Sequence, residues 1–472
     1  MENKKISIMA SYDWSLRYAF KHYVEFLDLS VTYRGKQYAI DLGRIIAEPL
    51  KCGENLNRTT NLIVDRTIHW NDYYKCWAQQ ALNCMMKVVN HSNTFNNYNK
   101  HSTYDLMARF ILPEDYFPTT VLLPQFFPYT DEQHRDEEWH TEQDSIRKHT
   151  HYGWDPARCF VDMQKVRSEM ADFHRHRAKS QIVRRHFYSA HNYLKEAMEH
   201  YFNNSYPVYL KKAFGGGGSD VYKINSLKEL YQRYDQTGER VFHLQEAIEN
   251  YDMFVRCLAV GPQVLPMRFE PDKPLHQHYS PDKLILDGAL FSRLKHYVLF
   301  INSYHRWTYN SFEALVKGGV ISPIDFANAC PDSNFTSLHV HFPWLLNALV
   351  KWFSFCAVTD IDMRIDLEET RYLRILHDPA LSRQEKFERV NAISREYFAI
   401  DKFQSFCREN FSGLEDKMIA FFDRHFNDVI RFAIAYSAFP EEEHAQKVRE
   451  YQALMQDHFR ANAKAYLKDP GL

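Results

Sequence analysis

A pair of lysines followed closely by four glycines is the part of this sequence best suited to bind an anion. Residues 208–210 have the β-branched and aromatic character of a short buried strand. The run Gly215–Gly218 must end that strand, because glycine loses much backbone entropy in an extended ladder. Successive glycines let several backbone N–H groups converge on one point, and the preceding Lys211 adds a positive charge. The pattern indicates a phosphate-binding loop.

The order of these residues differs from the two best-known phosphate-binding motifs. A P-loop has its lysine after the glycines, and the dinucleotide fingerprint GxGxxG opens a helix. In this chain the lysine comes first. Four glycines could also form only a flexible hairpin turn, so the phosphate interpretation depends on the residues that flank them.

Three oxygen-bearing side chains stand close together later in the sequence: Glu313, Asp325 and Asn328. Two strand-like runs meet at residues 317–319, and a hairpin would place Glu313 and Asp325 on adjacent strands that face one cavity. Carboxylate and amide oxygens, completed by phosphate oxygens and waters, suit Mg²⁺. A different interpretation makes Asp325 and Asn328 stabilise a turn before Pro331.

The elements that must position these residues indicate a mixed α/β protein. Before residue 98, strand-like apolar runs alternate with a helix-like run, as in an α/β domain. After Phe342 the sequence is helical in period, charged and nearly free of glycine. We expect four parts: an N-terminal α/β domain at 1–98, a part with the glycine-rich loop at 99–244, a part with the metal-type acids at 245–341, and a helical C-terminal region at 342–472.

The order of these features resembles that of the ATP-grasp superfamily, which includes D-alanine-D-alanine ligase, glutathione synthetase and the ribosomal-protein glutamate ligases. The resemblance spans roughly residues 90–331. It implies an ATP-grasp fold at 99–341, with a pre-ATP-grasp-like domain before it and a helical extension after it. It also implies ATP as a substrate and one or two Mg²⁺ ions as cofactors, with Mn²⁺ as a substitute.

The resemblance assigns a role to each residue of the pattern. Two lysines would meet the phosphates, four glycines would close over them, a strand end would meet adenine, an acid would hold the ribose, and three residues would bind metal. In that order they are Lys100 and Lys211; Gly215, Gly216, Gly217 and Gly218; Gln245, Glu246, Ala247 and Ile248; Asp252; and Glu313, Asp325 and Asn328. Where the family usually has E-x-N, this chain has D-F-A-N, with one more residue between the last two ligands.

The activity implied is an ATP-dependent carboxylate–amine ligation through an acylphosphate. Arg256, Arg268 and Arg306 are candidates to hold the substrate carboxylate or the acylphosphate, because a guanidinium binds such groups with two parallel hydrogen bonds. Each of these arginines could equally form a structural ion pair. Two other functions remain open: an ATP-dependent phosphotransferase on the same fold, and a nucleotide-binding scaffold without catalysis.

The amino-acid composition indicates the cellular compartment and limits the classes of partner molecule. The formal net charge of -2 gives no field that would favour nucleic acid or a membrane surface. The eight cysteines include no CxxC pair, which is typical of free thiols in a reducing compartment, and no apolar run approaches the roughly 18 residues of a membrane span. We expect a cytoplasmic protein whose partners are small-molecule or peptide carboxylates and amines, and which forms a homo-oligomer through its helical C-terminal region.

Overall fold

The computed structural model of the chain describes two compact units, and each has its own core. It covers residues 1–10, 13–45, 47–56, 60–66, 71–91, 93–96, 100–123, 135–151, 160–177, 190–213, 220–237, 241–359, 361 and 366–469. The larger unit comprises residues 1–118 and 248–472, and the inserted unit comprises residues 119–247. This division is coarser than the four parts expected from the sequence, which remain a proposal.

The first sheet of the larger unit has five strands in the order β2-β3-β1-β4-β5. Strand β1 pairs in parallel with β3 and β4, β4 pairs in parallel with β5, and β2 is antiparallel to β3. The strand-like runs expected before residue 98 are confirmed by β1, β4 and β5. The bounds are β1 (Glu2–Ala10), β2 (Ser30–Tyr33), β3 (Lys36–Leu42), β4 (Leu62–Arg66) and β5 (Lys87–Val89), with helices α1 (Trp14–Leu27) and α2 (Asp72–Asn83).

The second sheet of the larger unit is wholly antiparallel and has the order β13-β12-β14-β15. Its strands are β12 (Met253–Val260), β13 (Gln263–Arg268), β14 (Tyr309–Lys317) and β15 (Val320–Asn328). The short helices α3 (Asn93–Asn96) and η2 (Leu275–Gln277) and the longer α4 (Lys100–Phe110) and α9 (Gly288–Tyr304) complete this part. The hairpin expected at residues 312–325 is confirmed and extends further at both ends.

The region after residue 334 is helical, as expected, but it is part of the core of the larger unit. All residues of α11 (Phe342–Val358) are buried, which fits a helix that carries apolar residues on every side. Its Asn347 accepts a 2.7 Å hydrogen bond from Tyr23 of α1. The other elements are α10 (Phe335–Leu338), η3 (His339–His341), α12 (Glu369–His377), α13 (Arg383–Tyr397), α14 (Ile400–Asn410), α15 (Leu414–Ala435), η4 (Glu441–Glu443), α16 (His444–Leu454), η5 (Met455–Phe459), η6 (Arg460–Asn462) and α17 (Ala463–Leu467).

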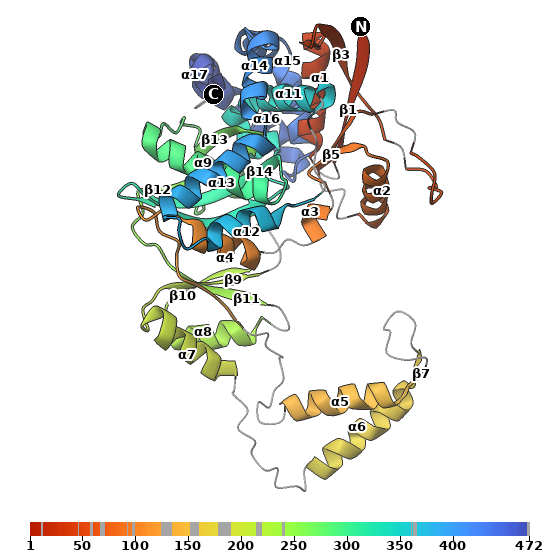
Figure 1. The fold of residues 1–472 in the computed structure, drawn as a ribbon, viewed down its shortest axis with the longest axis vertical. Coiled ribbons are helices and arrows are strands. Elements are labelled where there is room, and N and C mark those ends of the chain that lie inside the picture. Colours follow the sequence, from red (N-terminus) through yellow and green to blue (C-terminus); the bar gives the residue numbers. More distant parts are fainter. Residues whose placement is uncertain are drawn as a thin grey trace. The chain divides into compact units, whose positions relative to one another are not determined.

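The inserted unit is built on a four-stranded antiparallel sheet with the order β10-β9-β11-β6. Helices α7 and α8 lie beside it (Figure 1), and their Leu194 and Leu230 share a core with Leu210 of β9. The bounds are β6 (Thr120–Leu122), α5 (Arg135–Lys148), β7 (Thr150–His151), β8 (Phe160–Val161), α6 (Met163–Arg177), α7 (Ala190–Phe202), β9 (Val208–Lys212), β10 (Val221–Ile224), α8 (Leu227–Asp235) and β11 (Phe242–Glu246). In the part of the chain that the structure describes, none of the helices has the length and apolar character to cross a bilayer.

Two buried histidines of η3 hold the segment that follows β13. His339 Nε2 donates to the Tyr279 carbonyl at 3.0 Å, and His341 Nε2 donates to the Ser280 carbonyl at 2.9 Å. Nδ1 of His339 accepts from the Val340 N–H, so this ring is neutral. Burial lowers the pKa of His339 to about 3 and that of His341 to about 4.

We expect these histidines to make the larger unit sensitive to acid. Because the pKa of His341 is about 4 when folded and about 6.5 when unfolded, the unfolded chain takes up the proton first as the pH falls, and stability is lost from about pH 6.5 down to about pH 4. A His341→Gln variant, which keeps a donor for Ser280 but does not titrate, should lose about 2 kcal/mol less than the natural chain between pH 7 and pH 5. Urea unfolding at the two pH values measures this difference, and parallel losses would contradict it.

Gly261, in the turn between β12 and β13, has a positive φ of 57° and lies directly against Trp352 of α11. A Cβ at this position would overlap the Trp352 ring. Gly318, in the turn between β14 and β15, has the same φ, but a Cβ there would meet no atom within 4 Å. The two glycines therefore separate the effect of backbone strain from the effect of steric overlap.

A Gly261→Ala variant should be less stable than the natural chain by about 2 to 4 kcal/mol, because overpacking adds to the cost of a left-handed backbone. The matched Gly318→Ala variant should lose only about 1 kcal/mol. Denaturant unfolding of both variants measures the two effects. Equal losses would show that α11 moves away from the turn at no cost.

Candidate functional site

The β14–β15 hairpin places Glu313 directly opposite Asp325, as the sequence predicted. Ser311 stands opposite Asn328, so two steps along β14 correspond to three steps along β15. The difference is a β-bulge, which takes up one extra residue in β15. Residues two apart in a strand share a face, so the partners of Ser311 and Glu313 also share a face. The bulge thus brings Asp325 and Asn328 to the same side in spite of the longer D-F-A-N spacing.

Each carboxylate of this pair faces a cation. Arg256 on β12 lies opposite Glu313 in the register, and its Nη2 is 3.2 Å from Glu313 Oε1. Lys100, the first residue of α4, donates to Asp325 Oδ2 at 2.6 Å. Burial alone would lower the pKa of Lys100, but the nearby charges of Asp325 and Glu313 raise it above its ordinary value. We use the name carboxylate group for the set of four residues made up of Glu313 and Asp325 with their two cations, Arg256 and Lys100.

Aromatic rings enclose the Arg256 side chain. Its guanidinium carbon is 5.1 Å from the centre of the Phe269 ring and 5.8 Å from that of Tyr279. Burial raises the pKa of Tyr279, so its phenol stays protonated. Burial would lower the pKa of Arg256, but Tyr279 and Glu313 raise it. Arg256 is therefore a fixed positive charge beside Glu313.

Asp252, the residue expected to hold a ribose, lies at the turn end of the same hairpin. Its Oδ2 accepts from the Gly318 N–H at 2.7 Å, and its own N–H donates to the Val316 carbonyl at 2.8 Å. Lys317 of the turn donates to the Glu249 carbonyl at 2.7 Å. Asp252, directly before β12, and the carboxylates of Glu313 and Asp325 on β14 and β15 are thus carried by one sheet.

In the inserted unit, Lys211 and Gln245 are brought together on adjacent strands β9 and β11. Lys211 Nζ donates to Gln245 Oε1 at 2.6 Å, and Gln245 Nε2 donates to Thr120 Oγ1 at 2.8 Å. Glu246, next in β11, accepts from the Thr119 N–H at 3.1 Å. The chain then passes through Ala247 into the larger unit.

The four glycines Gly215–Gly218 lie outside the described residues, so the expected phosphate-binding loop is not tested. The strands at either end of that loop are described: Lys211 of β9 pairs with Val221 of β10 in an antiparallel ladder. Lys212 Nζ is 3.4 Å from Asp220 Oδ2. Lys212 is therefore paired locally, whereas Lys211 is directed to the neighbouring strand.

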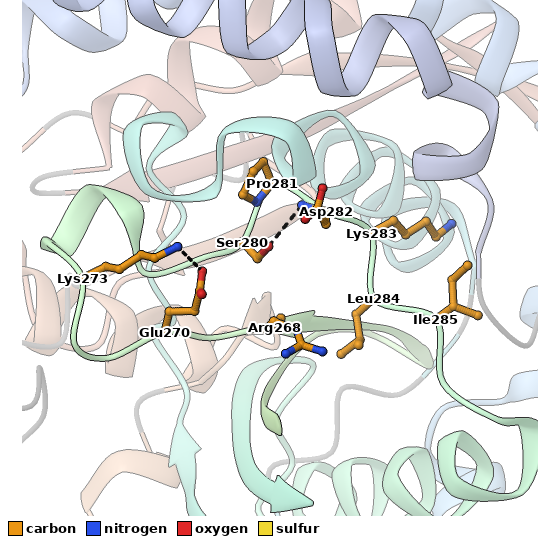
Figure 2. A pocket seen from close by; sticks show the side chains of 9 residues that line it. All are labelled: Arg268, Glu270, Lys273, Ser280, Pro281, Asp282, Lys283, Leu284 and Ile285. Carbon is orange, nitrogen blue, oxygen red and sulfur yellow. Dashed lines mark hydrogen bonds and ion pairs between the residues drawn. The ribbon is translucent and has the colours of Figure 1, made fainter. Parts of the chain in front are cut away.

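Two of the predicted arginines do not join the carboxylate group. Arg306 is 2% exposed and pairs with Glu368 at 2.7 Å, with a further hydrogen bond to the Asp366 carbonyl. Arg268 stands opposite Val255 in the register, one residue beyond the Met267–Arg256 pair, so it lies on the other face of the sheet. There it lines a separate cavity (Figure 2).

A buried ion pair that sequence reasoning missed fixes the segment after β15. Arg66, at the end of β4, donates to Asp13 Oδ2 at 2.8 Å through Nε, and its Nη2 donates to the Pro331 carbonyl at 2.5 Å and to Ser333 Oγ at 3.1 Å. Its guanidinium lies 4.7 Å from the centre of the Tyr309 ring. The sequence signal that could have predicted this ion pair is the position of Arg66, a charged residue at the carboxyl end of an apolar strand-like run.

The donor set fits a hard cation that also takes ligands from outside the chain. Among the described residues, no three of His, Cys, Asp and Glu gather so as to hold a metal by themselves. Glu313, Asp325 and the Asn328 amide offer oxygen atoms on one face of the hairpin. Mg²⁺ is commonly held by one or two carboxylates plus phosphate oxygens and waters. The residues present therefore fit Mg²⁺ bound together with a phosphate-bearing molecule.

Comparison with solved structures gives distant matches that include several ATP-grasp proteins. They include a RimK domain ATP-grasp protein from Sphaerobacter thermophilus, at 13% identity over 70% of this chain and 92% of that chain, with a TM-score of 0.39. The D-alanine–D-alanine ligase from Bacillus anthracis complexed with ATP matches at 9% identity over 85% and 99%, with a TM-score of 0.38. The chain is structurally similar to ATP-grasp ligases.

A third match is the macrocyclase MdnC from Microcystis aeruginosa bound with precursor peptide MdnA, at 8% identity over 74% of this chain and 98% of that chain, with a TM-score of 0.41. No protein-family model matches the sequence, and no curated protein sequence matches it. At such low identities and scores, no residue role is carried over from these proteins.

The pairing of Lys100 with Asp325 leads to a prediction about metal binding. The ammonium occupies a carboxylate oxygen that a metal would need, so a Lys100→Met variant should bind Mn²⁺ about tenfold more tightly when no nucleotide is present. Electron paramagnetic resonance of free Mn²⁺ measures this affinity. A Lys273→Met variant, which removes a lysine paired with Glu270 instead, serves as the control. Equal affinities in all three proteins would show that Asp325 is not a ligand.

Proposed function

We propose that this chain is an ATP- and Mg²⁺-dependent ligase that joins a carboxylate to an amine through an acylphosphate. The observation that carries the proposal is the placement of Glu313 and Asp325 opposite each other on β14 and β15. Two carboxylates at adjacent positions repel each other unless cations lie beside them. Here the cations are a buried arginine and a lysine whose ammonium can leave for a phosphate.

Glu313, Asp325 and Asn328 would hold Mg²⁺, which when bound supplies positive charge to the oxygens of the ATP triphosphate. Lys100 would exchange its bond to Asp325 for a bond to phosphate, which would leave that carboxylate oxygen to the metal. In the inserted unit, Lys211 is the second phosphate-directed lysine. Asp252 holds the ribose hydroxyls, and the β11 strand end at Gln245 and Glu246 meets adenine.

Arg256 is the residue best placed to hold the substrate carboxylate and the acylphosphate, because its charge is fixed beside Glu313. In the first step a carboxylate oxygen attacks the γ-phosphorus, and the bond from that phosphorus to the bridging oxygen of ADP breaks. In the second step the amine nitrogen attacks the acyl carbon, inorganic phosphate leaves, and the nitrogen loses a proton. Such catalysis depends mainly on positioning and on neutralising charge.

We predict that Asp325→Asn and Glu313→Gln each lower the rate of phosphate release on the order of 100-fold, because each removes one carboxylate that binds the metal. The assay combines ATP and Mg²⁺ with pools of amino acids, dicarboxylates and short peptides. An Asp423→Asn variant, which breaks an ion pair with Arg460 in the C-terminal region, should keep the natural rate.

The products separate the proposal from its rivals. A ligase releases ADP and inorganic phosphate together, whereas a phosphotransferase releases ADP while its phosphate stays on the acceptor. ATP binding without any ADP formation across all pools would favour a scaffold. Near-natural rates in both carboxylate variants at limiting Mg²⁺ would overturn the metal assignment.

A further inference from the structure

The cavity that contains Arg268 lies on the side of the sheet opposite to the carboxylate group. Strand register alternates along β13: Met267 stands opposite Arg256, and Arg268 stands opposite Val255. Phe269, the next residue, has its ring beneath Arg256 again. The cavity has a volume of about 620 Å³, a size typical of pockets for small molecules.

Two segments form the walls of this cavity, and Figure 2 shows them facing each other. One wall is the end of β13 and the loop after it, with Arg268, Glu270 and Lys273. The other wall is the run Ser280–Ile285. The lining carries three cations and two acids, and one of the acids, Glu270, is already paired with Lys273 at 2.7 Å.

The backbone of both walls is held firmly before any ligand arrives. The Ser280 N–H donates to the Arg268 carbonyl at 3.0 Å, which ties the two walls together at one end. The C-terminal region holds the second wall: Tyr466 donates to the Pro281 carbonyl at 2.6 Å, and Lys283 donates to the Ala465 carbonyl. A pocket whose walls are preorganised pays less ordering cost on binding.

The positive charges on the two walls are incompletely compensated. Within the described part of the chain, the Arg268 guanidinium has no hydrogen-bond or ion-pair partner. Among the same described residues, Lys283 donates to a carbonyl but pairs with no carboxylate, and burial together with the charge of Lys468 lowers its pKa. An anion in the cavity would give the Arg268 guanidinium two hydrogen-bond acceptors, and it would place a negative charge beside the Lys283 ammonium.

We propose that this cavity binds a small organic anion with two acidic groups, one held by Arg268 and the other by Lys283, whose side chain extends away from Arg268 in Figure 2 and would turn from the Ala465 carbonyl into the cavity. Leu284 and Ile285 give the same cavity an apolar side, which suits a carbon skeleton between the two groups. Carboxylate and phosphate share the chemistry that these cations recognise. The inference does not depend on the proposed ligase activity, because the cavity and the carboxylate group lie on opposite faces of the sheet.

Isothermal titration calorimetry of the full chain tests the proposal, with EDTA present and ionic strength held constant. The probes are succinate, citrate and 3-phosphoglycerate, with acetate as an anion of single charge. We expect one saturable site per chain, with acetate about tenfold weaker or more than the best probe. A preference for 3-phosphoglycerate identifies phosphate as one of the two groups, and a preference for succinate or citrate identifies two carboxylates; both results support the site.

Variants assign the binding to this cavity. Arg268→Gln and Lys283→Met should each weaken the best probe about tenfold. Arg268 is exposed, so the Arg268→Gln variant should keep the natural melting temperature. It therefore tests the site even if Lys283→Met, which loses the bond to the Ala465 carbonyl, folds poorly. Arg374→Gln, which removes the same charge from a second cavity of about 660 Å³, is the matched control and should bind normally. Absence of any saturable binding, full binding by Arg268→Gln, or an equal loss in Arg374→Gln would overturn the proposal.

Discussion

Repulsion between the carboxylates of Glu313 and Asp325 is the constraint on which the polar contacts around β14 and β15 depend, because each carboxylate needs a cation beside it. The ladder holds the two groups side by side, and each is matched by a cation that comes from a different element. Arg256 is in turn enclosed by Phe269 and Tyr279, and Tyr279 is positioned through its carbonyl by a buried histidine of the C-terminal region. The arrangement of one hairpin therefore determines where the surrounding side chains must lie.

The sequence predicted those features that depend on residues close to one another along the chain. The strand-like runs and the turn at 317–319 were enough to predict the hairpin and the placement of Glu313 and Asp325 on adjacent strands, and both are confirmed. The strand at residues 208–210 was predicted for a similar reason, since the apolar run closely precedes the glycines, and β9 includes it. Short-range pattern decides such features, because a strand and its turn are specified by neighbouring residues.

The sequence was much less informative where a contact joins distant segments. The pairing of Arg66 with Asp13, and its bonds to residues 331 and 333, could not be read from periodicity, because they depend on how two sheets pack. Strand register also stayed hidden: only the structure shows that Met267 of β13 stands opposite Arg256. The same holds for the bulge that brings Asn328 to the side of Asp325.

The two segments of the larger unit are synthesised at different times, because residues 119–247 lie between them in the sequence. Residues 1–118 are made first, yet their helix α1 contacts α11 through Tyr23 and Asn347, and Thr32 of β2 bonds Asn410 of α14, 378 positions away. A nascent chain that has not yet reached α11 and α14 lacks the partners of Tyr23 and Thr32. Contacts so distant in sequence are formed slowly, and the surface they will cover is exposed to aggregation meanwhile. Residues 119–247 carry their own core and can fold during that interval, so synthesis would complete the inserted unit before the unit that surrounds it.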